Sequence, residues 1–345
     1  MRFDLDRLQR FVTDVLMAVD VLPDHAETTA RRLLEADLRG RTGHGIIRVP
    51  QYVGRIEGGA INLRPDIEVR RPTPVSALID GDNGLGQVVM TIAAETAIAK
   101  AEESGMAWVG TVRSNHAGAA GIYAGMALDR GLVAIYAAVA SANVMPPWGG
   151  RERLLGTNPL AIAIPGGADP GFQLDIATTV ASHGTIEVLA QAGENMPEGW
   201  VVDENGEPIT DPTEADRGFL MPIGGYKGSG INMAIGLLAG VLNGAAFGSD
   251  VIDHRAVPDQ EANTGQSIFV MRPDLLRDPD DFKAGIDRHL AEMRASGDPG
   301  EVHIPGDGAK QLEDEQRAEG IPLPAVLLGQ LRGLASRFGL DDDLS

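Results

Sequence analysis

Two glycine-rich loops place the strongest constraint on this fold, because each carries three glycines in the spacing Gly-x-x-Gly-x-Gly. They span residues 81–86 and 225–230. The usual dinucleotide-binding fold requires the reverse spacing, Gly-x-Gly-x-x-Gly, between a strand and a helix. Neither loop has the lysine followed by serine or threonine that defines a P-loop. The spacing therefore argues against both a conventional Rossmann fold and a P-loop fold.

The second loop is the better candidate for an anion site. Glycine-rich loops present backbone N–H groups to phosphate without needing side-chain charge. Lys227 lies inside this loop, and the uncharged segment 231–247 follows it. We expect that segment to be a buried helix whose regularly spaced glycines allow close packing. A plain tight turn with a surface lysine is the alternative.

The charge balance limits the partners of the chain. A net charge of −20 over 345 residues disfavours nucleic acid and anionic membrane surfaces. Any anionic ligand must therefore meet positive charge that is local. The absence of cysteine excludes disulfides and thiolate metal sites. The N-terminal residues lack a signal-peptide core, so we expect a cytoplasmic protein.

Hydrophobic periodicity predicts an α/β chain, and its length allows two packed domains. Residues 4–39 read as two helices, and the Pro- and Arg-rich passage from Arg64 to Pro74 reads as a linker. The strands predicted beyond it are Ser76–Ile79, Ala107–Val112, Leu132–Val139, Ala161–Ile164, Gln173–Ile176, Val201–Val202 and Ser267–Met271. The predicted helices are Val88–Ala101, Tyr123–Asp129, Lys310–Glu319 and Pro324–Phe338, with a loop over Arg294–Ile304.

Two histidines close to glycines, His44 and His116, are candidates for proton transfer. Imidazole suits that role because its ordinary pKa lies near the working pH. Arginine suits a substrate carboxylate because its planar guanidinium binds both oxygens. If Gly43 to Tyr52 is one helix, His44, Arg48 and Tyr52 share a face. Oxidation of a 2-hydroxy acid requires such a base and such a carboxylate partner.

Other chemistries have less support. His254, His289 and His303 are predicted to lie at the surface, and no His-x-x-x-His spacing suggests zinc, so no metal site is expected. A serine hydrolase would need a Gly-x-Ser-x-Gly turn, which is missing. Ser182 beside His183 is too close in sequence to form a typical nucleophile and base pair.

Several blocks of sequence resemble the malate/L-lactate dehydrogenase family. This family of non-Rossmann dehydrogenases also includes sulfolactate and ureidoglycolate dehydrogenases and cyclic imino acid reductases. The matching blocks are residues 38–50 (LRGRTGHGIIRVP), 154–161 (LLGTNPLA), 174–178 (LDIAT), 222–230 (PIGGYKGSG) and 303–307 (HIPGD). The resemblance extends over residues 35–330.

The resemblance implies an L-sulfolactate dehydrogenase-like mixed α/β fold. A helical substrate domain would comprise residues 1–72 and 305–345, and a mixed-sheet NAD(P)-binding domain residues 73–304. The implied activity is NAD- or NADP-dependent interconversion of a small 2-hydroxy acid and its 2-oxo acid, in a homodimer. Alternatives are reduction of a cyclic imino acid of the Δ1-piperideine-2-carboxylate type, or ligand binding without catalysis.

The resemblance also implies roles for individual residues. The catalytic set is His44, His116, Arg48 and Asp175, and the substrate contacts are Arg48, Tyr52, Asn115 and Thr157. The cofactor contacts are Ser141, Asp175, Ile176, Ala177, Thr178, Thr179, Val180, Ala181, His183, Tyr226, Lys227, Gly306, Asp307 and Gly308.

Two positions depart from the family pattern. Many relatives have serine before the first histidine, whereas this chain has Gly43. A proton relay through that hydroxyl is therefore absent. Relatives often carry Arg or Tyr at position 183, where this chain has His183. If position 183 contacts the ribose or phosphates of the cofactor, the change alters the preference between NAD and NADP.

Overall fold

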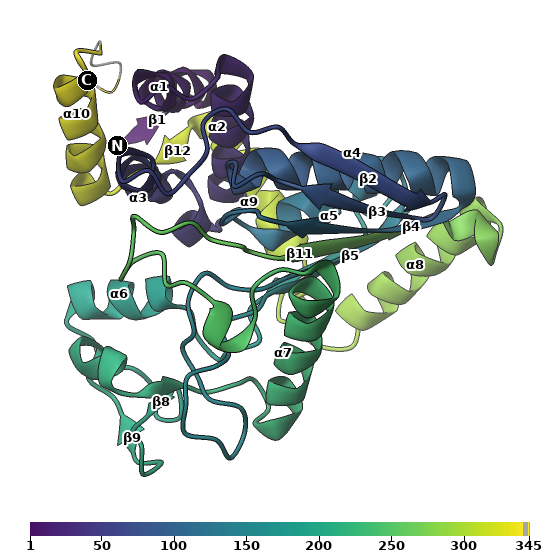
Figure 1. Ribbon diagram of the computed structural model, residues 1–345. Helices are drawn as coiled ribbons and strands as arrows, with labels where there is room; N and C mark the ends of the chain where they lie inside the picture. The colour runs from purple at the N-terminus through teal and green to yellow at the C-terminus, as the bar shows by residue number, and fades with distance from the viewer. Residues whose placement is uncertain (341–343, 345) are drawn as a thin grey trace.

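A seven-stranded mixed sheet forms the centre of the computed structural model, which describes residues 1–340 and 344 without the side chains of Arg71, Pro72, His183 and Gln191 (Figure 1). In spatial order its strands are β2 (Glu68–Thr73), β3 (Ser76–Asp80), β4 (Met106–Val112), β11 (Gln266–Met271), β5 (Val133–Ala138), β6 (Leu160–Ile164) and β7 (Phe172–Ile176). In this sheet β3 and β4 are parallel and the other neighbouring pairs are antiparallel. This arrangement confirms the mixed, non-Rossmann fold.

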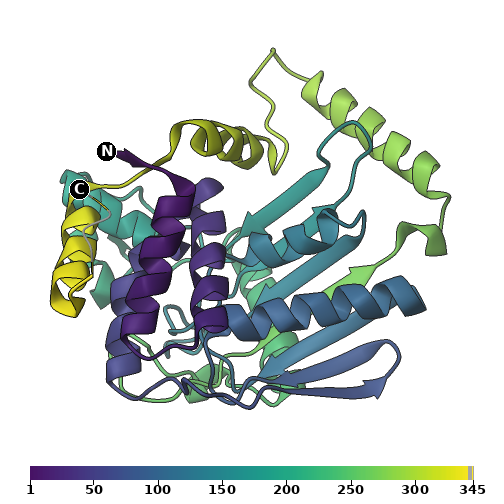
Figure 2. The ribbon, with the colours of Figure 1, turned by 90° about the horizontal axis from the view of Figure 1, so that it is seen from above.

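Helices cover both faces of the sheet (Figures 1 and 2). On one face α4 (Gly86–Ser104) and α5 (Ala120–Leu128) lie side by side across the strands, and on the other face α7 (Tyr226–Ala239) packs on β5 and β11. Alanines dominate the layer under α4 and α5, with Ala93, Ala97, Ala124, Ala134 and Ala161 fully buried. Such small side chains let the helices lie close to the strands.

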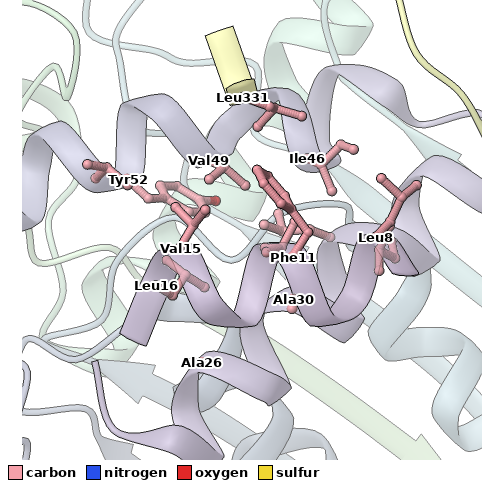
Figure 3. Close-up of a cluster of buried hydrophobic side chains, with 14 of the residues drawn as sticks. Leu8, Phe11, Val15, Leu16, Ala26, Ala30, Ile46, Val49, Tyr52 and Leu331 are labelled. Carbon is pink, nitrogen blue, oxygen red and sulfur yellow. The ribbon is translucent and has the colours of Figure 1, made fainter. Parts of the chain in front are cut away.

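The two ends of the chain share one helical core. It contains α1 (Leu5–Ala18), α2 (Pro23–Leu38), α3 (Val49–Glu57) and α10 (Ala325–Phe338), and β1 (Arg2–Phe3) pairs with β12 (Ile321–Pro322) beside it. Figure 3 shows side chains of this cluster, including Phe11, Leu16, Tyr52 and Leu331. The apolar stripe of α1 faces inward, as the spacing of its leucines and valines predicts. Helix α9 (Asp307–Glu319) packs against α2.

A smaller lobe lies on the side of the sheet that carries α7 (Figure 1). It consists of α6 (His183–Ala192) and a three-stranded sheet of β8 (Val201–Val202), β9 (Pro208–Ile209) and β10 (Phe219–Leu220). A separate apolar cluster with Val201 and Met196 holds it together. Helix α8 (Pro279–Arg294) was not predicted, and the loop expected after it is confirmed. Helix α6 and the short strands β1, β9, β10 and β12 were not predicted either, whereas the strands predicted in the central sheet and the helices α1, α2, α4, α5, α9 and α10 are present with shifts of a few residues at their ends.

The condition that residues 43–52 form one helix is not met. Two 3₁₀ turns, Thr42–His44 and Ile46–Arg48, precede α3. Gly45, at φ −89° and ψ −149°, breaks the helical backbone between them. The side chain of Asp37 accepts a hydrogen bond from the Ile46 amide at 2.8 Å and stabilises this broken form. The chain therefore turns twice before Tyr52, and a shared helix face no longer explains how the site residues meet.

The linker predicted over Arg64–Pro74 is partly a strand. Residues Glu68–Thr73 form β2, which pairs with β3 and has an irregularity between Arg70 and Thr73. Edge strands tolerate proline, because an outward-facing position in the ladder needs no N–H donor. The proline content that suggested a linker is therefore also compatible with an edge strand.

The prediction that residues 231–247 form a buried helix is also wrong for this single chain. Helix α7 ends at Ala239, and its buried face, with Ile235 and Ala239, packs against the sheet. The opposite face is apolar and exposed, with Leu242, in the turn that follows, 64% accessible. No helix within the described residues is long and apolar enough to cross a membrane.

Truncation of Leu331 tests the shared core. Leu331 on α10 is fully buried, so Leu331→Ala should lower the free energy of unfolding by about 2–5 kcal/mol. Val326 on the same helix is 67% exposed, and Val326→Ala should change it by less than about 0.5 kcal/mol. Urea unfolding of both variants measures the difference. Equal values would mean that α10 does not contribute to this core.

Candidate active site

The site forms where β3 and β4 end. Carboxyl ends of parallel neighbours meet at the same edge of a sheet. The loop over residues 81–86 follows β3, and the segment leading to His116 follows β4. The backbone amide of Asn83 donates to the Arg113 carbonyl at 2.8 Å. A Cβ on Gly86 would lie 2.3 Å from the backbone carbonyl oxygen of Asn115. The first glycine loop is therefore a close-packing element that supports His116.

Two histidines meet at this edge. The rings of His44 and His116 stack with centroids 5.5 Å apart and planes 24° apart. The Tyr52 hydroxyl lies 2.6 Å from Nδ1 of His116. Among the described atoms, Nδ1 of His44 is buried and has no hydrogen-bond partner. The structure thus brings together three residues that the sequence singled out, although by way of two turns and a helix.

Burial keeps both imidazoles neutral. Burial is the largest cause, and together with the charges of Arg48 and Arg41 it lowers the pKa of His44 to about 4. Burial, followed by the charge of His44 and then of Arg48, holds the pKa of His116 well below its ordinary value. Both rings can therefore accept or share a proton near neutral pH. The site is locally positive in a chain of net charge −20.

Arg48 ends the second turn, directly before α3. Its Nε donates to the Gly43 carbonyl at 2.6 Å, and its Nη1 donates to Gln51 at 3.1 Å. These two bonds leave other N–H groups of the guanidinium for a carboxylate. Because no acidic side chain pairs with Arg48 within the described chain, a bound anion would supply its counter-charge.

A buried carboxyl supports the loop that carries His44. Burial raises the pKa of Asp37 to about 7, although the hydrogen bond from the Ile46 amide acts to lower it. A Cβ on Gly45 would lie 2.0 Å from Oδ1 of Asp37, so only glycine fits there. The glycine after His44 therefore allows the carboxyl to lie against the backbone of the loop.

His254 and Arg55 lie at the site, and sequence reasoning did not find them. His254 was expected at the surface but is 3% exposed, and burial lowers its pKa to about 3. Its amide donates to the carbonyl of Ser141, and both residues line a shallow pocket. The loop folds inward because buried Arg55 donates to the carbonyls of Pro258 and Gln260. His289 and His303 are exposed, as predicted.

Asn115 is held by its neighbours. Its amide nitrogen donates to Asn83 and to the Gly84 carbonyl, and its oxygen accepts from Arg55 at 3.2 Å. The side chain is buried. The substrate contact expected for Asn115 stays a prediction, and the observed bonds give it a part in joining the two loops.

The segment 175–181 forms a wall beside the turn that carries His44. Arg41 donates to the Asp175 carbonyl at 3.0 Å and lies 3.5 Å from its carboxylate. Burial raises the pKa of Asp175 above its ordinary value, against the opposing charge of Arg41. At the start of α6, a Cβ on Gly184 would lie 3.9 Å from Cα of Gly43. The segment and the 42–44 turn are therefore neighbours.

A polar network fixes the rest of this wall. The Thr178 amide and hydroxyl donate to the Thr157 carbonyl, and Asn232 of α7 donates to the Thr178 hydroxyl at 2.7 Å. Val180 donates to the Met221 carbonyl and Ile223 to the Thr178 carbonyl. The segment is thereby joined to Thr157 and to the second glycine loop. Ile176, Ala177, Thr179 and Ala181 lie within the same stretch.

The second glycine loop leads into α7 as expected. Gly225, at φ 65°, precedes the helix, and no side chain caps its N-terminus. Tyr226 and Lys227 form the exposed first turn, and Lys227 has no acidic partner within the described residues. Free amides and an unpaired lysine at a helix N-terminus suit a phosphate. This loop therefore has the features of a phosphate site.

The loop over residues 306–308 lies against β7. The Gln173 amide donates to the Pro305 carbonyl, and a Cβ on Gly306 would lie 3.2 Å from Gln173. Arg294 binds both oxygens of Asp307 and holds the pKa of that carboxyl below its ordinary value. Their cofactor role, like that of Gly308, stays a prediction. The side chain of His183 lies outside the described residues.

Comparison with known proteins gives a consistent result. A family model described as malate/L-lactate dehydrogenase matches residues 3–332. The chain is 37% identical to L-sulfolactate dehydrogenase of Methanothermobacter thermautotrophicus over 99% of this chain and 98% of the relative. It is 31% identical to a Δ1-pyrroline-2-carboxylate reductase of Ancylobacter novellus, over 97% and 98%. The solved sulfolactate dehydrogenase of Methanocaldococcus jannaschii superposes with a TM-score of 0.89 at 34% identity, over 99% and 98%.

Titration of the histidines tests the electrostatics of the site. Because the folded pKa of His44 lies below its ordinary value of 6.5, the stability that the neutral ring contributes is present above pH 6.5. That stability is lost as the pH falls towards about 4. NMR should therefore show His44 titrating near pH 4, and Arg48→Gln should raise the midpoint by removing a repelling charge. A wild-type midpoint near 6.5 would contradict the burial of this ring.

Proposed function

The chain belongs to the malate/L-lactate dehydrogenase family, and we propose that it interconverts a small 2-hydroxy acid and its 2-oxo acid with NAD or NADP. One observation carries the proposal: a stacked pair of neutral imidazoles lies close enough to the unpaired Arg48 for its charge to lower both their pKa values. These groups match the proton acceptor and carboxylate partner that oxidation of a 2-hydroxy acid requires.

The proposed reaction divides the work between few residues. Arg48 binds the substrate carboxylate and orients C2 towards the histidines. One neutral imidazole takes the hydroxyl proton as the C–H hydride leaves and the C=O bond forms. When bound, the nicotinamide supplies the hydride acceptor. In the reverse direction the imidazolium returns the proton readily to the oxygen, because its pKa is low.

The cofactor proposal is supported by the wall and the second glycine loop. Lys227 and the uncapped start of α7 would hold phosphates, while Ser141 and residues 175–181 would line the rest of the path. The proposed division assigns residues 73–304 to cofactor binding. The helical core formed by both chain ends supports a separate domain of residues 1–72 and 305–345.

Reduction of a cyclic imino acid is a second candidate. The match to a Δ1-pyrroline-2-carboxylate reductase over nearly the whole chain favours it. The same histidine would then donate its proton to a ring nitrogen instead of an oxygen. Formation of a cyclic amine from an imine carboxylate, with oxidation of the reduced nicotinamide, distinguishes this activity from the first.

A homodimer is part of the proposal. Six apolar side chains of α7 and the turn after it are exposed: Ile231, Met233, Leu237, Leu238, Val241 and Leu242. A contiguous apolar face of this kind is typical of a subunit interface. Asn232, on the buried face of the same helix, bonds to Thr178, so pairing through α7 would stabilise the cofactor wall as well.

Substitution of the histidines tests the proposed chemistry. His44→Gln or His116→Gln should lower kcat by about 100-fold or more, because each removes an imidazole from the site of proton transfer. Absorbance of the nicotinamide at 340 nm, measured with a panel of 2-hydroxy acids, reports the rates. His289→Gln, at an exposed histidine, is the control. Full turnover of the double variant would overturn the assignment.

Substitution of Lys227 tests the phosphate site. Lys227→Met should raise the KM for NAD or NADP about 10-fold, since one charge-assisted hydrogen bond is lost. The kcat should change little. Lys283→Met on α8 is the matched control, and an equal effect of both substitutions would contradict a specific role for Lys227.

A charge in the apolar face tests the dimer. Leu242→Arg should convert the dimer into monomers, because an unpaired guanidinium cannot be buried in an apolar interface. Sedimentation velocity measures the mass. Val326→Arg places the same charge on a comparably exposed valine of α10 and should leave the dimer intact. A wild-type monomer would contradict the proposal.

A further inference from the structure

A short chain of hydrogen bonds lies behind His116. Nε2 of Gln87 donates to the Tyr52 hydroxyl at 2.7 Å, and that hydroxyl lies 2.6 Å from Nδ1 of His116. Gln87 is fully buried and Tyr52 is 4% exposed. Sequence reasoning gave Tyr52 a substrate contact and Gln87 no role.

The three residues come from three separate elements. Gln87 is the second residue of α4, directly after the first glycine loop, and His116 follows β4. Tyr52 lies on α3, and its ring is part of the helical core in Figure 3. A ring packed in this way has little freedom, so the position of its hydroxyl is fixed. The first glycine loop fixes both ends of this series of hydrogen bonds. Gln87 follows the loop directly, and the segment that carries His116 is hydrogen-bonded to it.

The direction of the bonds follows from the donors available. The Gln87 amide donates to the phenol oxygen, and Nδ1 of His116 is the only acceptor that the hydrogen bonds of the described residues offer to the single phenol hydrogen, so that hydrogen points at His116. Burial raises the pKa of Tyr52 to about 12, so that hydrogen stays on the phenol. A ring nitrogen that accepts a hydrogen bond carries no proton. The proton of neutral His116 must then lie on Nε2.

We propose that Tyr52 and Gln87 are positioning residues that hold neutral His116 as its Nε2–H tautomer. His116 then presents a hydrogen-bond donor to the oxygen on C2 of the substrate. This inference rests on the proposed function and refines it. In this tautomer the nitrogen facing the substrate already carries a proton and cannot take the hydroxyl proton. That proton goes to the neutral ring of His44 as the hydride leaves C2.

The unpaired oxygen of Gln87 supports a role in positioning. Oε1 of Gln87 is buried and has no hydrogen-bond partner among the described atoms. Such a group weakens folding, and an apolar side chain of similar size would avoid the penalty. The benefit of glutamine at this position is therefore the hydrogen bond that it donates to Tyr52. Thr91 meanwhile bonds to the backbone carbonyl of Gln87 and fixes the first turn of α4.

The direct test is ¹⁵N NMR of the full-length protein with labelled histidines and no substrate. The difference from His116→Gln identifies the resonances of His116. We expect Nδ1 to resonate as an unprotonated, hydrogen-bonded nitrogen and Nε2 as a protonated one. A proton on Nδ1 of the wild-type ring would overturn the proposal. Because the measurement needs no turnover, its outcome does not depend on the proposed function.

Two variants of Gln87 sharpen the test. In Gln87→Glu an ionised carboxylate accepts the phenol hydrogen, so the proton of His116 should move to Nδ1 at pH values above the pKa of the new carboxyl. Gln87→Met removes the donor without adding an acceptor and should leave the proton on Nε2. The kcat of Gln87→Glu should fall at least 10-fold below that of Gln87→Met over the same pH range. Equal tautomers and equal rates in both variants at high pH would overturn the proposal.

Tyr52→Phe separates positioning from substrate binding. Loss of the phenol should let the two tautomers interchange, so the Nδ1 and Nε2 resonances of His116 move towards each other and kcat falls about 10-fold or more. A higher KM for the substrate with unchanged His116 resonances would assign Tyr52 to the substrate instead. Urea unfolding of each variant confirms that the fold is retained.

Discussion

The parallel pairing of β3 with β4 determines where the site lies. Because their carboxyl ends meet, the glycine loop after β3 lies against the segment after β4 that carries His116. Gly86 permits that contact, since any side chain there would collide with the Asn115 carbonyl. Gln87 begins α4 immediately beyond the loop. The position of His116 and of the groups behind it therefore depends on this one strand pair.

The second constraint is the concentration of positive charge in an acidic protein. Arg41 and Arg48, on the turns around His44, lower the pKa of His44, and the charge of Arg55 lowers the pKa of His254. Burial is the larger cause for both rings. A carboxylate substrate and a cofactor with phosphates would bring the missing negative charge. The site is thus arranged to bind anions while its histidines remain neutral.

Much of the fold could be predicted from the sequence, because apolar periodicity marks strands and helices wherever one face is buried. It failed at α7, where an exposed apolar face looks the same in sequence as a buried one. It also failed at β2, because proline suits both a linker and an edge strand. His44, His116 and Arg48 were found through motifs. His254 and Gln87 were missed, since only the fold brings Gln87 beside Tyr52, 35 positions away, and His254 beside the distant Arg55.

The proposed chemistry of this site is the transfer of a hydride from C2 of a 2-hydroxy acid. The most direct measurement is mass spectrometry of the reduced nicotinamide formed from a 2-hydroxy acid deuterated at C2. Each reduced nicotinamide should carry one deuterium, transferred from C2 of the acid. Reduced nicotinamide without deuterium, formed at the same rate as with the unlabelled acid, would contradict the proposed chemistry.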